Sequence, residues 1–188
     1  LLNALEELEA AVDCCRRCPL AGTRNRTVFG AGDCRAGVMF VGEAPGRDEA
    51  LQGEPFVGRA GKLLDKMISA IGFTRDDVYI ANILKCRPPD NRDPLEKEVA
   101  ECEPYLKRQI ELSKPSVICA LGSGAAQNLL KTGTSLGKLR EGVHYYDDTR
   151  LIVTYHPAAL LRNPRFKRPA WEDLQLLRKI YDEEREGR

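Results

Sequence analysis

The sequence predicts an α/β fold, namely a three-layer sandwich with a central, mainly parallel four-stranded sheet flanked by helices. Short apolar runs alternate with stretches whose apolar residues recur at helical intervals, and this alternation is typical of parallel sheets covered by helices. Of the 188 residues, 43% are hydrophobic and 30% are charged, as in globular proteins. The length fits one compact domain, so we expect residues 1–188 to form a single unit.

Each predicted element follows from its own pattern. The apolar runs predict strands at 38–41, 78–84, 117–121 and 151–155, with a hairpin around Asp147 and Asp148 before the last one. Helical spacing predicts helices over residues 1–12 and 57–71, from Gly122 onward, and around Trp171 near the end of the chain. A further helix is expected to start at Asp93 and to kink or restart near Cys102, because Pro104 lies inside its pattern. No apolar run approaches the roughly 18–20 residues of a membrane helix, so we expect no membrane association.

The predicted topology directs attention to one edge of the sheet. In open parallel sheets, ligands bind beyond the carboxyl ends of the strands. This rule selects the segments 42–49, 82–92, 122–126 and 156–162.

The segment GEAPGRDE follows the first strand directly. Gly42, Pro45 and Gly46 allow a tight turn whose N–H groups point at a ligand, and Glu43 would project into the crevice. The alternative is an ordinary turn with a solvated acidic residue, and the spacing alone does not decide between the two. A phosphate loop of the Walker type is excluded, because Gly61-Lys62 is followed by Leu63 rather than Ser or Thr.

His156 follows the last predicted strand, in the segment HPAALLRNP. A neutral imidazole at a strand end can donate a hydrogen bond to a developing oxyanion. Residues 156–169 also hold four basic side chains, Arg162 among them, and no acidic one. An exposed Leu160 or Leu161 on such a loop could wedge into a base stack. The alternative is a short amphipathic helix that covers the core, which explains the leucines but not the charge.

Phe56 and Asn82 complete this constellation. An aromatic ring near a glycine-rich turn can stack on a base, and an asparagine at a strand end can pair with an amide edge. Each has a plain alternative, a core phenylalanine and a strand-terminating asparagine.

Seven cysteines suggest metal binding rather than disulfides. Their number is odd and no secretory signal pattern is present, so we expect a reducing compartment. Cys15 and Cys18 form a C-x₂-C pair, and Cys86 and Cys102 follow separately, which allows zinc or an iron–sulfur cluster. Cys14 could replace Cys15. The remaining cysteines, Cys34 and Cys119, are expected to pack as small apolar residues.

The segments GEAPGRDE, PFVGRAG, NILKCRPP and HPAALLRNP together resemble the uracil-DNA glycosylase superfamily, in particular the iron–sulfur family 4 enzymes. The resemblance covers nearly the whole chain and implies the same α/β fold. It further implies a 4Fe-4S cluster held by Cys15, Cys18, Cys86 and Cys102, in an N-terminal cluster-binding segment of a single glycosylase-like domain.

The resemblance also implies an activity, the hydrolysis of the N-glycosidic bond of uracil flipped out of DNA, which leaves an abasic site. The catalytic residues would be Glu43 and His156. Substrate binding would involve Gly42, Ala44, Gly46, Phe56 and Asn82, and DNA binding would involve Leu160 and Arg162. We expect single- or double-stranded uracil-containing DNA as the partner, a monomer, and a cytoplasmic location, associated with the nucleoid in a prokaryote.

This sequence departs from related patterns at several positions. Ala44 stands where family 1 enzymes have their catalytic aspartate, and Ala158 stands where a serine is commoner. Arg47 and Asp48 occupy positions that are often acidic, which leaves the role of Glu49 open. Residues 85–94 lack the basic insert of a related branch that crosslinks to uracil-DNA, which argues against that activity.

The net charge of +1 excludes DNA binding by bulk charge alone, so any such binding must come from local clusters.

Two other classes of function remain alternatives. An iron–sulfur electron carrier would make the His156 segment irrelevant. A non-catalytic protein that binds uracil-DNA would use the same pocket without cleaving the bond.

Overall fold

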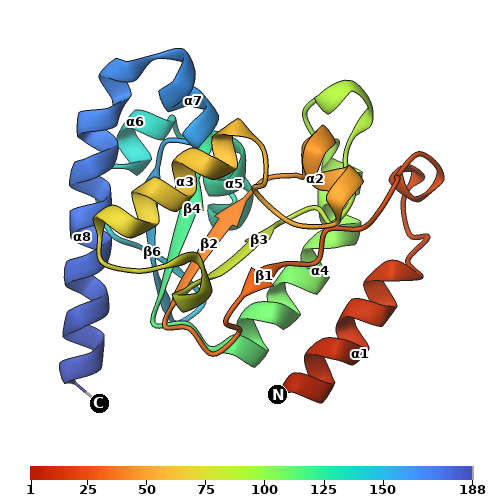
Figure 1. Ribbon diagram of the computed structural model, residues 1–188, viewed down its shortest axis with the longest axis horizontal. Helices are drawn as coiled ribbons and strands as arrows, with labels where there is room; N and C mark the ends of the chain where they lie inside the picture. Colours follow the sequence, from red (N-terminus) through yellow and green to blue (C-terminus); the bar gives the residue numbers. More distant parts are fainter. Residues whose placement is uncertain (188) are drawn as a thin grey trace.

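The computed structural model describes residues 1–187 as helices packed around one six-stranded sheet (Figure 1). The strands are β1 (Ala31–Gly32), β2 (Val38–Gly42), β3 (Tyr79–Asn82), β4 (Val117–Leu121), β5 (His144–Tyr146) and β6 (Thr149–Thr154). The α-helices are α1 (Leu2–Asp13), α2 (Arg47–Gln52), α3 (Arg59–Ala70), α4 (Glu96–Ser113), α5 (Gly122–Leu130), α6 (Leu136–Leu139), α7 (Pro157–Arg162) and α8 (Lys167–Glu186). Short 3₁₀ helices are η1 (Pro19–Gly22), η2 (Arg75–Asp77), η3 (Pro89–Asn91) and η4 (Pro164–Phe166).

The sheet has the order β1-β3-β2-β4-β6-β5, and its four central strands are parallel. These four are the predicted strands, so the fold class is confirmed, but the expected total of four strands is wrong. The two additional strands are antiparallel edges of two and three residues. Segments this short carry too little side-chain pattern to predict a strand. The hairpin expected around Asp147 and Asp148 is present, because β5 and β6 pair on either side of a turn at Asp147.

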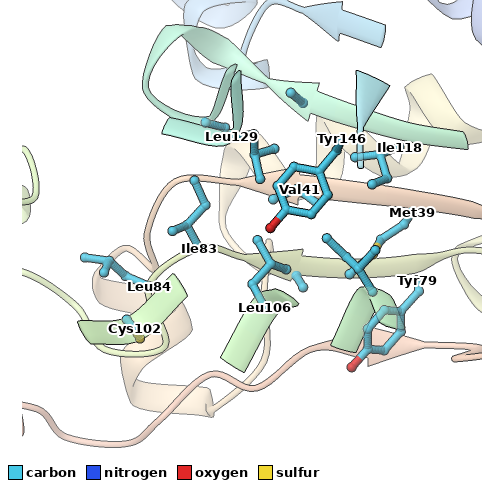
Figure 2. Packing of buried hydrophobic residues seen from close by; sticks show 14 of the residues in the cluster. Met39, Val41, Tyr79, Ile83, Leu84, Cys102, Leu106, Ile118, Leu129 and Tyr146 are labelled. Atoms are coloured by element: carbon cyan, nitrogen blue, oxygen red, sulfur yellow. The ribbon is translucent and has the colours of Figure 1, made fainter. Parts of the chain in front are cut away.

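Alternate residues of the central strands build two cores, one on each face of the sheet. Met39 and Val41 of β2 face a core shared with α1, α4 and α5, whereas Val38 and Phe40 face a core shared with α3 and α8. In Figure 1, α3 and α8 lie on one side of the sheet, and α1 and α4 lie on the other. Figure 2 shows the first core, in which side chains of the sheet meet Leu106 of α4. The three predicted layers are therefore present.

Helix α4 begins later and runs further than predicted. It begins at Glu96 rather than at Asp93, and the Glu98 carboxylate accepts the N–H of Leu95 at 2.9 Å. The helix continues through Pro104 to Ser113, so of the kink or restart expected near Cys102, the restart is wrong. Leu106 and Ile110, buried against the sheet beyond the proline, stabilise the continuous helix. None of the helices within residues 1–187 is long and apolar enough to cross a membrane.

Candidate active site

The four segments selected by the strand-end rule line a single cavity of about 680 Å³. The cavity lies at the carboxyl ends of the parallel strands, where β2, β3, β4 and β6 each lead into a loop or helix. Its wall includes Glu43, Phe56, Asn82, His156 and Arg162. These five residues come from four separate parts of the chain, and the parallel topology brings them together.

Gly42, at the end of β2, lets two of these side chains meet. It is paired in register with Asn82 of β3. A Cβ at Gly42 would collide with Asn82 Oδ1 and would lie 2.8 Å from Cζ of Phe56. The amide and the ring therefore lie over a backbone position that has no side chain. Ala44 and Gly46 of the following turn line the cavity itself.

Asn82 presents an unsatisfied acceptor. The residue is 2% exposed, and its Oδ1 has no hydrogen-bond partner among the described residues. Leaving a buried acceptor unpaired costs about 1–3 kcal/mol. Such an atom in a cavity wall is what a site for a hydrogen-bonding ligand requires, because the ligand supplies the missing donor.

His156 is held as a neutral donor. Its Nδ1 accepts the N–H of Ala158 at 3.0 Å, so the ring proton is on Nε2. Burial, and secondarily the positive charge of Arg162, lower the pKa of His156 to about 4. The imidazole is consequently uncharged at neutral pH, with one N–H group available. Its ring centroid lies 5.5 Å from that of Phe56.

Phe56 has a strained backbone that its neighbours hold in place. Its φ of 53° lies in the left-handed region, which costs about 1–3 kcal/mol for a residue other than glycine. The Arg75 guanidinium donates to the carbonyl oxygens of Pro55 and Phe56, the latter at 3.3 Å. Gly61 of α3 lies so close to the Phe56 carbonyl that a Cβ there would collide with it.

Glu49 fixes the other side of this turn. Its Oε1 accepts the N–H groups of Val57 and Gly58 at 3.1 and 3.3 Å. The role of Glu49 is open from the sequence alone, and Arg75 is not among the predicted site residues. Neither residue has a sequence signal for this role, because each acts on the backbone of a different segment, eight or more residues away along the chain.

Glu43 is partly buried against the start of α5. A Cβ at Gly124 would collide with its carboxylate carbon and both oxygens, so the carboxylate occupies the space that a side chain at Gly124 would need. Burial raises the pKa of Glu43, and the negative charge of Asp93 raises it further. From the sequence, Gly124 and Asp93 belong only to the predicted starts of two different helices. The tertiary fold brings both residues close to Glu43, and no sequence pattern indicates this.

Of the two residues proposed for DNA contact, Arg162 is exposed and Leu160 is not. Leu160 is 2% exposed and packs in the core with α3 and α8, so its expected exposure is wrong. The segment forms helix α7, the plain alternative, and turns Leu160 inward, whereas the next residue, Leu161, is 40% exposed. Arg162 is exposed at the cavity wall, and the other three basic residues of this segment, Arg165, Lys167 and Arg168, are exposed as well.

Four cysteines surround a second, smaller cavity between the N-terminal segment and α4. The cavity is lined by Cys15, Cys18, Cys86 and Cys102, whereas Cys14 is exposed and lies outside it. Cys34 and Cys119 are buried in the cores, as predicted. Within residues 1–187, no three His, Cys, Asp or Glu side chains converge closely enough to hold one metal ion. The four thiols thus enclose a space without meeting at a point.

A parallel sheet covered by helices, with a cavity at the carboxyl ends of its strands, is typical of α/β proteins that bind a ligand at that edge. Sequence similarity shows to which family the chain belongs. The chain belongs to the uracil-DNA glycosylase superfamily, whose model matches residues 29–175. It is 46% identical to the type-4 uracil-DNA glycosylase of Archaeoglobus fulgidus, over 88% of this chain and 87% of the relative. It is 40% identical to the type-4 enzyme of Thermotoga maritima, over 91% of each chain. The family resemblance is thereby confirmed.

Proposed function

We propose that this protein excises uracil from DNA by hydrolysing its N-glycosidic bond, leaving an abasic site. The observation that carries the proposal is the unpartnered Oδ1 of Asn82 in the same cavity wall as the neutral His156. The names of the type-4 relatives support the same activity. Duplex DNA hides the bond inside the base stack, so the nucleotide must flip into the cavity, at a cost of a few kcal/mol.

The flipped uracil is bound through its ring face and its amide edge. The edge offers an N–H donor beside a carbonyl acceptor, and the Asn82 carboxamide offers the complementary acceptor and donor. Uracil N3–H would satisfy the orphaned Oδ1. The Phe56 ring, fixed by its strained backbone, would stack on the base. Gly42 keeps the floor of this pocket free of a side chain.

Bond cleavage needs opposite charges stabilised at its two ends. As C1′–N1 breaks, the electron pair moves into the uracil, and His156 Nε2–H would donate to the uracil carbonyl oxygen that gains negative charge. The N–H groups of the turn containing Ala44 and Gly46 would assist. The sugar becomes oxocarbenium-like, and the Glu43 carboxylate would stabilise that positive charge and orient the attacking water.

DNA contact would come from the exposed side chains beside the cavity. Arg162 would bind a phosphate near the flipped nucleotide, with the neighbouring basic residues adding attraction. Leu161, rather than the buried Leu160, is the side chain that would fill the gap in the base stack. The basic residues beside the cavity would thus attract DNA locally, although the net charge of the whole chain is only +1.

We also propose that Cys15, Cys18, Cys86 and Cys102 bind a 4Fe-4S cluster. Four cysteine thiolates are the ligand set of such clusters, and these four side chains line one cavity. The resemblance to the iron–sulfur family 4 enzymes favours the cluster over a zinc ion. When bound, the cluster would supply a structural cross-link between the N-terminal segment, the β3–α4 loop and α4. On this proposal, residues 1–188 form one glycosylase domain, monomeric and cytoplasmic, and nucleoid-associated in a prokaryote.

Replacement of Asn82 by Asp tests the proposed pocket. The carboxylate retains an acceptor for N3–H but loses the donor and places a negative charge beside the uracil carbonyl. We expect kcat/KM for a single-uracil oligonucleotide to fall at least tenfold and inhibition by free uracil to weaken in parallel, as the loss of one good hydrogen bond predicts. Unchanged inhibition by free uracil would rule out Asn82 as the base-binding group.

A further inference from the structure

Lys85 is a fully buried lysine that the proposed reaction does not use. It is 1% exposed, and within residues 1–187 it forms no ion pair. Its ammonium instead donates to three acceptors, which are the carbonyl oxygen of Asn82 at 2.8 Å, that of Phe29 at 3.1 Å, and Oε1 of Gln109 at 2.5 Å. Burying a lysine costs free energy, so a buried lysine that has hydrogen bonds but no ionic partner suggests a specific role.

The same residue also borders the cysteine cavity. The backbone N–H of Lys85 donates to Sγ of Cys102 at 3.2 Å, and the next residue along the chain is Cys86. Lys85 therefore contacts two sites at once. Its backbone lies against the sulfur of one proposed cluster ligand, and its side chain holds the main chain of the proposed base-binding residue.

Asn82 depends on such support. Its side-chain Oδ1 makes no hydrogen bond among the described residues, so protein contacts to that atom do not fix its position. The amide must be placed by the backbone that carries it and by packing over Gly42. A charge-assisted hydrogen bond to the Asn82 carbonyl is among the strongest restraints available in a buried site.

We propose that Lys85 is a positioning residue, which holds Asn82 in the orientation that binds the base and connects it mechanically to the cysteine cavity. The inference rests on the proposed function, because it assigns the support of the Asn82 pocket. It requires no contact between Lys85 and the substrate.

Lys85→Met tests this proposal, because it keeps an unbranched side chain but removes the ammonium. The variant is purified with its cluster, and visible absorbance reports cluster content. We expect the inhibition constant of free uracil to rise roughly tenfold and kcat/KM on uracil-DNA to fall similarly, the loss predicted for one charged hydrogen bond. In an Asn82→Ala background the same change should alter kcat/KM less than twofold, since the residue through which Lys85 acts is already gone.

Tyr79→Phe is the matched control. It removes the hydroxyl that accepts from Gln109 at 2.9 Å, and so perturbs the same buried network without touching the Lys85–Asn82 contact. We expect lower stability with an unchanged uracil inhibition constant. A purely structural role for Lys85 would make the two variants behave alike.

Three results would overturn the inference. The first is a Lys85→Met protein with its cluster and wild-type inhibition by uracil. The second is an equal effect of the change with and without Asn82. The third is loss of the cluster in both Lys85→Met and the more conservative Lys85→Gln, which would make the role structural. Failure of the wild-type holoprotein to release uracil would refute the proposed function instead, so the two failures are distinguishable.

Discussion

Gly124→Ala gives a prediction in which stability and activity should change in opposite directions. Gly124 is the third residue of α5, and its φ lies outside the left-handed region, so alanine fits the backbone. Replacing glycine by alanine inside a helix stabilises it by about 0.5–1 kcal/mol. The new methyl group, however, would occupy the space of the Glu43 carboxylate.

The size of the catalytic effect follows from this overlap. Carbon atoms in contact lie about 3.5–4.0 Å apart, so the carboxylate would have to move by more than about 1 Å. Glu43 can make this movement cheaply, because the overlapping atoms are the end of a flexible side chain. A 1 Å displacement of a catalytic group costs about 100-fold in rate, so we expect kcat to fall by about that factor.

The assay is single-turnover release of uracil from a single-uracil oligonucleotide, combined with thermal unfolding. The matched control is Gly137→Ala in α6, where a Cβ meets no atom within 4 Å, and this variant should retain full activity. A Gly124→Ala protein with near wild-type kcat would refute the placement of Glu43 as the group that stabilises the sugar cation. Reduced stability together with reduced activity would instead indicate a general packing defect.

Three further predictions address charge, DNA contact and the cluster. Activity should fall on the acid side as Glu43 is protonated, and its raised pKa brings this loss to a higher pH than for an ordinary glutamate, while His156, with a pKa of about 4, stays neutral. A Glu43→Gln protein should be slow and should lack this acid limb, as profiles of rate against pH would show. Leu161→Ala should lower kcat/KM on duplex DNA more than on single strands without loss of stability, whereas single-strand and duplex rates that fall equally would argue against a wedge. Cys15→Ala should abolish the visible absorbance and iron content of the purified protein, whereas Cys14→Ala should leave both unchanged; equal iron in all samples would refute the ligand set.

The sequence predicts the sheet and the location of the cavity because both follow from local patterns and one topological rule. Four apolar runs identify the parallel strands, and the strand-end rule places Glu43, Asn82 and His156 at the same edge of the sheet, where they line one cavity. The edge strands escape prediction, because pairings of two and three residues have no period to detect.

The errors at the site have a common physical origin. Leu160 and Leu161 are the same residue type at adjacent positions. Only the orientation of α7 about its own axis buries the first and exposes the second. Gly124 shares its space with Glu43, and Lys85 contacts the carbonyl of Asn82, through packing that no spacing in the sequence encodes. Local patterns therefore identify the groups that do chemistry more readily than the groups that hold them.

The most direct test of the account is the fate of a single uracil in DNA incubated with the holoprotein. The released base is identified by mass, and abasic sites are counted by cleavage in alkali. We predict free uracil and abasic sites in equal amounts, with many turnovers per protein, and little product from a Glu43→Ala or His156→Ala protein. Tight binding of uracil-DNA without released base, or a redox-active cluster in a protein that leaves the DNA intact, would contradict the account.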